Sequence, residues 1–396
     1  MRILHLYKTH LPDTYGGVPQ FIDQLARGVT QRGHAVDVLF PSRQRLLDAS
    51  TVGNYTNHPV PLHLELASTT FSLSVFKKFA ELADNADIVH YHFPWPLMDL
   101  VHLTALSSKP SVVTYHSDVV RQRFGLRLYR PLMKKFLDSV DRIVATSPNY
   151  CATSETLRSY ASKTRAIPIG VDQSTYPQPP ASVIEKWRAR VGDQFFLFVG
   201  GLRYYKGLHI LLEAVNGTDI PVVIVGKGPV ERALHGQAKR HGLSNVQLLG
   251  ELPDEDKFAL LTLCLAFVFP SHLRSEAFGI SLLEGAMYGK PMISAEIGTG
   301  TTFINIDRQT GLVVSPSDAN ALRRAMIYLT EHPVLAKRMG QNARLRYEKL
   351  FTADLMVQRY LDLYDEMLRE SRRGKGHGIV AQRPSGQGTP DRHLSR

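Results

Sequence analysis

Short apolar runs alternate with longer stretches of helical period along most of the chain. Ten of these runs have the length and composition of buried strands: RILHLY, AVDVLF, ADIVHYH, PSVVTYH, DRIVATS, FFLFVG, PVVIVG, VQLLG, AFVFPS and PMISA. The periodicity between them predicts helices over residues 18–32, 207–215, 230–241 and 319–329. Near-continuous apolar strands that alternate with helices are typical of parallel sheets covered on both faces. The pattern therefore predicts an α/β protein.

Ten strands are too many for one small doubly wound sheet, and a proline-rich segment divides them. This segment, STYPQPP, spans residues 174–180. We expect two Rossmann-like domains facing each other across a cleft, at residues 1–175 and 181–350. A last helix at 351–370 is expected to pack on either domain and could cross back to the first. Ligands of such sheets bind at the carboxyl ends of the strands, so the cleft is the expected active site.

Composition places the chain among ordinary globular proteins. Apolar residues make up 43% and charged residues 21% of the 396 residues. The two cysteines, Cys151 and Cys264, give no disulfide framework, which favours a reducing cytosol. The first residues, MRILHLYKTH, are too polar for a signal peptide, and no apolar run reaches about 18 residues. We expect a cytoplasmic protein without a transmembrane helix.

The net charge of +11 is unevenly distributed. Residues 371–396 hold six Arg or Lys and one Asp, and they are rich in Gly, Ser, Gln and Pro. This composition predicts a disordered basic tail. Excess positive charge suits an anionic partner such as nucleic acid, an anionic lipid surface or a phosphorylated substrate. The chain carries no nucleic-acid motif, and we expect no nucleic acid among its partners.

Glycine pairs follow the first strand of each predicted domain. Gly16 and Gly17 directly precede a helix, where backbone amides can approach a ligand. In the second domain a glycine pair is followed by Arg203 and Lys206, two cations suited to a diphosphate. Gly228, in VVIVGKGP, is a candidate to border a nucleotide base. The alternatives are a plain strand-to-helix turn at the first pair and a solvated loop around the cations.

The segment SEAFGISLLEGAMYGKP contains two carboxylates with separate predicted roles. Glu276 is expected in a loop near a sugar, and Glu284 in a helix that begins near residue 280. An ionised carboxylate only accepts hydrogen bonds, so Glu284 suits a ribose diol. Backbone N–H groups at the start of that helix suit a phosphate or a sugar hydroxyl. The residues at this helix start are Phe278, Gly279 and Ile280.

Histidines provide further candidates in the first domain. His116 and Asp118 come just beyond a strand, and the histidine could line a reacting centre or be structural. His90 and His92 lie two apart on another strand and so share a face. Without a third ligand nearby in the sequence, they are expected to bind no metal.

These motifs in this order resemble glycosyltransferase family 4. They are Glu276 and Glu284 eight residues apart, the Gly-x5-Lys-Gly sequence ending in Lys206-Gly207, His116 after its strand, and the N-terminal glycine pair. The resemblance covers roughly residues 1–365. It implies the GT-B architecture, a retaining reaction, a nucleotide-sugar donor held mainly by the second domain, an acceptor on the first, and no metal or other cofactor.

The resemblance also implies residue roles. Glu284 would bind ribose, Glu276 would support the transition state at the donor sugar, and Lys206 would bind the diphosphate. His116 would line the reaction centre, with Asp118 on the acceptor side. Family members often carry an arginine directly after the glycine at the position of Gly201. Arg203, two residues on, is the candidate for the missing charge.

Other features narrow the expected substrates. Segments such as HLYKTHLPDTYGGV resemble those of bacterial mannosyl- and rhamnosyltransferases of O-antigen or capsule assembly. This resemblance implies a GDP-sugar donor and an undecaprenyl-diphosphate-linked acceptor. A basic amphipathic helix at 119–136 could rest on an anionic membrane surface or simply cover the sheet. A UDP-sugar donor and a non-catalytic nucleotide-sugar-binding protein are the alternatives. An NAD-dependent oxidoreductase is disfavoured because no GxGxxG follows the first strand.

Overall fold

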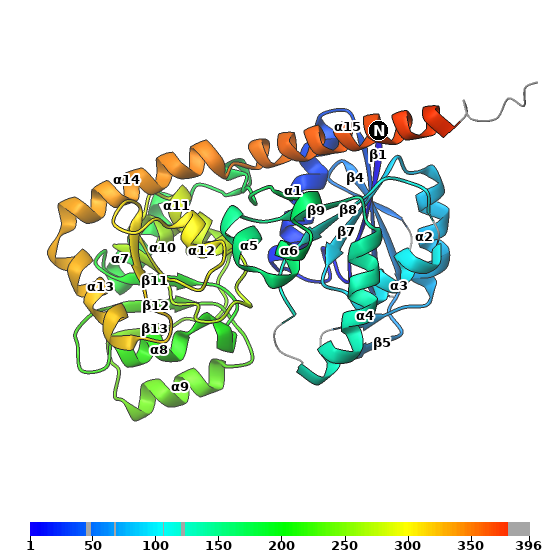
Figure 1. Cartoon of the computed structure of the whole chain (residues 1–396). Coiled ribbons are helices and arrows are strands. Elements are labelled where there is room, and N and C mark those ends of the chain that lie inside the picture. The colour runs from blue at the N-terminus through cyan, green and yellow to red at the C-terminus, as the bar shows by residue number, and fades with distance from the viewer. Residues whose placement is uncertain (45–48, 67–68, 106, 120–122, 379–396) are drawn as a thin grey trace, which may run out of the picture.

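The computed structural model describes residues 1–44, 49–66, 69–105, 107–119 and 123–378. Two sheets flanked by helices lie side by side, and the last two helices run along both of them (Figure 1). All ten strands predicted from the apolar runs are present, and the four predicted helices end within two residues of their predicted bounds. The α/β class and the two-sheet division are confirmed.

The N-terminal sheet has eight strands within the described residues, in the order β10-β9-β8-β7-β1-β2-β4-β3. Neighbouring strands are parallel except for β3 and β4. A separate antiparallel hairpin consists of β5 (Leu64–Leu66) and β6 (Thr69–Phe71). The strands of the main sheet are β1 (Arg2–Leu6), β2 (Ala35–Ser42), β3 (Ser50–Val52), β4 (Tyr55–Pro61), β7 (Ile88–Phe93), β8 (Ser111–Tyr115), β9 (Arg142–Ala145) and β10 (Thr164–Ala166).

Alternating side chains of β1 explain how this sheet is covered on both faces. Ile3 packs with residues of α1, whereas Leu4 packs with residues of α2, α3 and α4 on the opposite face. The helices of this domain are α1 (Gly17–Gln31), α2 (Ser74–Asn85), α3 (Pro96–Ala105), α4 (Arg123–Ser139), α5 (Pro148–Thr153) and α6 (Glu155–Ser159). Short 3₁₀ turns follow at Ala161–Lys163 and Gln173–Thr175.

The C-terminal sheet is parallel throughout its described strands, in the order β13-β12-β11-β14-β15-β16. Its strands are β11 (Phe196–Val199), β12 (Val222–Val225), β13 (Val246–Leu248), β14 (Ala266–Phe269), β15 (Met292–Ala295) and β16 (Gly311–Val314). Its helical elements are α7 (Ala181–Val191), the 3₁₀ turn η3 (Tyr204–Lys206), α8 (Leu208–Ala214), α9 (Glu231–Arg240), α10 (Asp254–Leu263), α11 (Ile280–Met287), α12 (Thr301–Ile304) and α13 (Ala319–Glu331).

The chain returns to the N-terminal domain at its end. Helix α14 (Pro333–Leu350) packs on α11, and α15 (Ala353–Gly378) packs on α1. From α15, Tyr360 and Tyr364 reach the N-terminal sheet, where their hydroxyls lie 2.8 Å from Thr114 Oγ1 and 2.7 Å from His90 Nδ1. Because α15 continues to Gly378, the prediction of disorder is wrong for residues 371–378, and residues 379–396 lie outside the described residues.

Candidate active site

A cavity of about 420 Å³ opens between the two domains at the carboxyl ends of their parallel strands. This is the end at which parallel sheets bind ligands. Nine of the twelve predicted site residues line it: Gly16, Gly17, His116, Lys206, Glu276, Phe278, Gly279, Ile280 and Glu284. Segments more than 250 residues apart in the chain therefore meet at one place.

Lys206 and Glu276 form a buried ion pair in this cavity. Lys206 ends η3 after β11, and Glu276 lies in the loop after β14. The two residues meet because β11 and β14 are neighbouring strands of the sheet. Ser271 Oγ donates a hydrogen bond of 3.2 Å to Glu276 Oε2. The Lys206 ammonium also lies 4.5 Å from the centre of the Phe269 ring. A cation and a carboxylate are thus held together in a largely buried position, where electrostatic interactions are stronger than in water.

Glu284 lies on the second turn of α11 with only 7% of its surface exposed. The Tyr176 hydroxyl donates a hydrogen bond of 3.0 Å to its Oε1. Burial raises the pKa of the Glu284 carboxyl, against the lowering effects of nearby Lys257 and of the Tyr176 hydrogen bond. Tyr176 belongs to the proline-rich segment between the domains. Its hydrogen bond to Glu284 was not predicted, because the composition of that segment is typical of a linker.

The start of α11 faces the glycine pair of the N-terminal domain. Gly279 precedes the helix with φ of +102°, a conformation that favours glycine, and no side chain of the described residues caps the first turn. A Cβ atom on Gly17 would lie 3.3 Å from Ile280 Cδ1, which is a tight contact across the cleft. The positive end of the α11 dipole is therefore brought close to the α1 turn inside the cavity.

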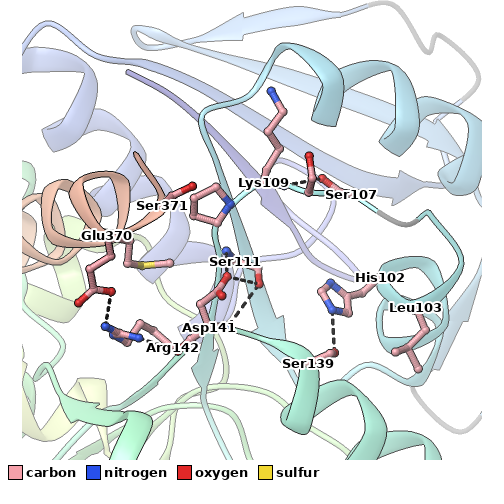
Figure 2. A pocket seen from close by; sticks show the side chains of 13 residues that line it. His102, Leu103, Ser107, Lys109, Ser111, Ser139, Asp141, Arg142, Glu370 and Ser371 are labelled. Carbon is pink, nitrogen blue, oxygen red and sulfur yellow. Dashed lines mark hydrogen bonds and ion pairs between the residues drawn. The ribbon is translucent and has the colours of Figure 1, made fainter. Parts of the chain in front are cut away.

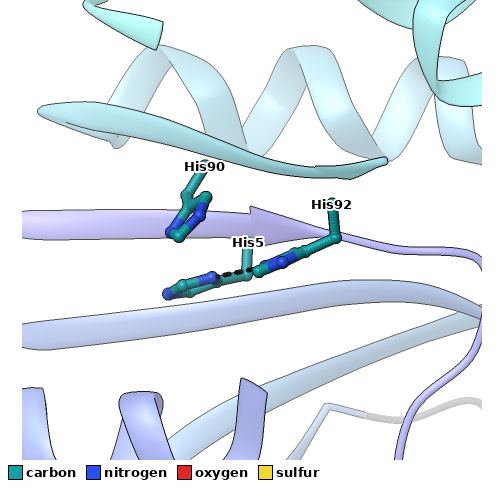
Figure 3. A group of neighbouring side chains, drawn as sticks. All are labelled: His5, His90 and His92. Atoms are coloured by element: carbon teal, nitrogen blue, oxygen red, sulfur yellow. Dashed lines mark hydrogen bonds between the residues drawn. The ribbon is translucent and has the colours of Figure 1, made fainter. Parts of the chain in front are cut away.

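His116 is the outermost of a group of buried histidines. Its Nε2 lies 3.1 Å from Nδ1 of His92. Nε2 of His92 in turn lies 2.9 Å from Nδ1 of His5, as Figure 3 shows. Burial lowers the pKa of His116 and of His5 to about 3 in each case. These imidazoles are therefore neutral near pH 7.

The expectation that no third potential metal ligand lies near His90 and His92 is wrong in the folded protein. Strand β1 places His5 beside them, and one nitrogen of each of the three rings lies within 4.8 Å of the others. Both nitrogens of His90 are hydrogen-bonded, at 2.7 Å each, to the Tyr364 hydroxyl and to Thr114 Oγ1. Metal binding by this group would have to displace those bonds.

Asp118 does not line the cavity but joins the two domains. Arg274 Nη2 of the C-terminal domain donates to its Oδ2 at 3.3 Å, and Ser154 Oγ donates to its Oδ1 at 2.7 Å. Arg274 Nη1 also donates to the Gly298 carbonyl at 2.8 Å. Asp118 thus makes a contact between the domains, and its acceptor-side role stays a prediction. Arg274 was missed because its partner lies 156 residues away.

Two other predicted residues lie outside the cavity. Arg203 is exposed and lines a separate cavity of about 600 Å³ with Lys8 and Arg43, so it does not join Lys206. Gly228 packs on the loop after β11, where an added Cβ would lie 2.3 Å from the Leu202 carbonyl oxygen. Close backbone packing therefore explains this glycine.

A larger cavity of about 560 Å³ lies at the opposite end of the N-terminal sheet (Figure 2). It is lined by Ser111 and Arg142 at the amino ends of β8 and β9, and by Glu370 of α15. Arg142 pairs with Glu370 at 2.5 Å, and Asp141 accepts hydrogen bonds from the Ser111 amide and hydroxyl. The charged side chains of this cavity have hydrogen-bond or ion-pair partners within the protein. The cavity also lies at the end of the sheet opposite to the one where parallel sheets bind ligands.

The predicted basic helix at 119–136 is α4, which begins at Arg123, with residues 120–122 outside the described residues. One side buries Met133, Phe136 and Leu137 against the sheet. The other side exposes Leu128 together with Arg127, Arg130, Lys134 and Lys135. Within the described residues, no helix is both long and apolar enough to cross a membrane.

Two Rossmann-like domains with a cleft at their strand ends make up the GT-B fold. Among solved structures, sucrose-phosphate synthase of Thermosynechococcus elongatus has this fold, with a TM-score of 0.78 at 22% identity, covering 93% of this chain and 99% of that one. Anabaena HepE in complex with UDP gives a TM-score of 0.73 at 20% identity, covering 92% and 100%.

Sequence comparison gives the family. The description "Glycosyltransferase Family 4" matches residues 15–175, and "Glycosyl transferases group 1" matches residues 182–346. The chain is 60% identical to D-rhamnosyltransferase WbpZ of Pseudomonas aeruginosa, over 89% of this chain and 93% of that protein. It is 51% identical to O-antigen chain mannosyltransferase C of Escherichia coli, over 93% and 99%. The chain belongs to glycosyltransferase family 4.

Proposed function

We propose that this glycosyltransferase is a retaining, metal-independent enzyme that transfers mannose or D-rhamnose from a GDP-sugar to a surface polysaccharide. The observation that carries the proposal is the meeting of Lys206, Glu276 and Glu284 in one interdomain cavity. The relatives named for D-rhamnosyl and O-antigen mannosyl transfer support the choice of sugars.

In this proposal, each of the three side chains contacts a different part of the elongated donor. The Glu284 carboxylate accepts hydrogen bonds from the ribose hydroxyls. Lys206 and the N-terminus of α11 bind the diphosphate, which gives the Lys206 ammonium a second anionic partner besides Glu276. Glu276 then lies against the sugar, where its negative charge stabilises an oxocarbenium-like transition state.

The proposed reaction follows a front-face course. The bond between the anomeric carbon and the diphosphate oxygen breaks, and GDP leaves with the electron pair. The acceptor hydroxyl attacks from the same face and passes its proton to the leaving phosphate oxygen. The new glycosidic bond keeps the α configuration. Lys206 stabilises the negative charge that develops on the leaving group.

The proposed acceptor is an undecaprenyl-diphosphate-linked glycan that approaches the N-terminal domain. The exposed basic side of α4 is our candidate for contact with an anionic membrane surface at its cytoplasmic face. Leu128, with 86% of its surface exposed, supplies an apolar group at the same side.

Calorimetric titration with GDP, UDP and ADP, first without metal and then with Mg²⁺, tests the donor and the metal. We expect GDP to bind about tenfold more tightly than UDP, with little change on adding Mg²⁺. Transfer from GDP-mannose and GDP-D-rhamnose, followed by NMR of the product's anomeric configuration, tests retention. Binding that requires Mg²⁺, or a β-linked product, would contradict the proposal.

A UDP-sugar donor is the second candidate. One structure of similar fold, HepE, is a complex with UDP and glucose, although its 20% identity to this chain carries the fold alone. Tighter binding of UDP would keep the enzyme and change the donor. No binding of any nucleotide would favour a protein that keeps the fold without the chemistry.

A further inference from the structure

Three buried imidazoles form a hydrogen-bonded chain that leads from the cavity into the N-terminal domain. His116 Nε2 lies 3.1 Å from His92 Nδ1, and His92 Nε2 lies 2.9 Å from His5 Nδ1. His5 and His92 are fully buried, and His116 is 7% exposed and lines the cavity. The three residues come from β1, β7 and the end of β8, which are adjacent strands.

The chain can carry its protons in only two arrangements. Burial lowers the pKa of His92 well below its usual value, as it does for His5 and His116, so all three rings are neutral near pH 7. A neutral imidazole has one N–H donor and one bare acceptor nitrogen. Each hydrogen bond needs one donor and one acceptor, so all N–H groups point inward or all point outward.

The inner end of the chain distinguishes these arrangements. His5 Nε2 is buried and has no hydrogen-bond partner within the described residues. Inward polarity would put an N–H donor at this nitrogen, and orphaned buried N–H groups are rare because they cost a lost hydrogen bond. Outward polarity leaves Nε2 bare and lets His5 donate to His92, and His92 donate to His116.

We propose that His5 and His92 are positioning residues that hold His116 as the Nδ1–H tautomer, so that it donates a hydrogen bond into the cavity. The group it recognises is an acceptor oxygen, either a hydroxyl or a phosphate oxygen of the bound donor. The tautomer does not depend on the proposed function, whereas its use in glycosyl transfer rests on it. The nitrogen that carries the proton is set by the partner of the other nitrogen.

His90 packs against the chain without belonging to it. Its ring centre lies 4.4 Å from that of His92 and 4.7 Å from that of His5. Its two nitrogens are bonded to Tyr364 and Thr114 instead. A metal ion held by His5, His90 and His92 is the competing use of these rings, and it needs lone pairs that the hydrogen bonds now occupy.

Nuclear magnetic resonance of the full-length protein labelled with ¹⁵N-histidine tests the tautomer directly. His116→Asn identifies the His116 signals. We expect protonated Nδ1 and bare Nε2 at His116 in the wild-type protein at pH 7.5. His92→Phe should move the proton toward Nε2. A wild-type His116 protonated on Nε2, or stoichiometric metal bound to His5 and His92, would overturn the proposal.

Two further variants separate positioning from stability. His92→Asn keeps an amide that can donate to His116 and is expected to restore the Nδ1–H tautomer and most of the turnover. His92→Phe should lower kcat about fivefold to tenfold with a smaller change in GDP affinity. His102→Phe is the matched control, because His102 is bonded to Tyr91 and Ser139 outside the chain. Equal loss of kcat in the Asn and Phe variants with an unchanged His116 tautomer would also overturn it. Absence of nucleotide binding would defeat the proposed function while leaving the tautomer result intact.

Discussion

Arg274 and Asp118 join the two domains next to the active site, with Arg274 Nη2 lying 3.3 Å from Asp118 Oδ2. Each is two residues from a residue of the cavity, since Arg274 precedes Glu276 and Asp118 follows His116. Thr153 and Gly298 complete the contact from either side. The position of one site loop is therefore coupled to that of the other.

Loss of this contact should lower turnover more than nucleotide binding. We expect Arg274→Ala and Asp118→Asn each to lower kcat about tenfold, because a small misplacement of reacting groups is costly. GDP affinity should change less than threefold, since Lys206 and Glu284 both lie in the C-terminal domain. Steady-state kinetics of the single and double variants measure the coupling. Additive losses would contradict a direct coupling of the two residues.

The Lys206–Glu276 pair should be essential for transfer. We expect Lys206→Ala and Glu276→Gln each to reduce turnover by about a hundredfold or more while the far-ultraviolet circular dichroism is unchanged. Lys227→Ala is the control, because Lys227 forms an exposed ion pair with Glu251 at 3.3 Å. Turnover near wild type in both site variants would remove them from the mechanism.

Glu284 and Tyr176 should act together in nucleotide binding. Glu284→Ala is expected to weaken GDP binding about tenfold to a hundredfold, since it removes a charged hydrogen-bond acceptor. Tyr176→Phe should weaken it less, because the carboxylate remains but loses its 3.0 Å partner. Calorimetry measures both, with Tyr328→Phe on α13 as the control. An unchanged GDP affinity in Glu284→Ala would exclude the ribose role.

Asp99 should make the stability of the N-terminal domain depend on pH. It is buried on α3, accepts a hydrogen bond from the Tyr129 hydroxyl, and burial raises its pKa to about 8. Because the pKa is raised in the folded state, the contribution of the Asp99 carboxyl to stability is fully present below the unfolded pKa of about 4. This contribution is lost as the pH rises toward 8.

The side chain introduced by Asp99→Asn is neutral at every pH. The stability of this variant relative to the wild type should therefore increase as the pH rises. We expect its free energy of unfolding, relative to wild type, to increase by roughly 2–4 kcal/mol between pH 5 and pH 8. Urea unfolding at both pH values measures this difference. Glu81→Gln, on the exposed ion pair with Lys78, is the control. A difference that stays constant with pH would show that Asp99 does not titrate in this range.

Much of the fold could be predicted because its signals are local. The runs at β1, β7, β8 and β11 are mainly apolar, which is typical of strands buried on both faces. The sequence patterns do not predict strands β3 to β6, β10 and β16, because segments such as Tyr55–Pro61 alternate polar and apolar residues without a clear run. Composition predicts a disordered tail from residue 371, whereas the helix α15 continues through Gly378.

The candidate site divides in the same way. The motifs in their order predict nine of the residues that line the cavity and, through their resemblance, the family. Their three-residue spacing predicts that Arg203 joins Lys206, yet Arg203 precedes the 3₁₀ turn that ends at Lys206 and lines another cavity with Lys8. The sequence predicts that Gly228 borders the nucleotide base, whereas the structure packs the Leu202 backbone against it.

By itself, the sequence determined the α/β class, the two domains and the residues that carry the site motifs, because strand burial, helix periodicity and turn glycines are written within about 20 consecutive residues. Only the tertiary structure decided which side chains share a partner. The links from His5 to His92, from Asp118 to Arg274 and from Tyr176 to Glu284 each span more than 80 residues. Such pairs form because adjacent parallel strands, and two domains facing across a cleft, bring the ends of distant segments to the same place, and no local pattern records that approach.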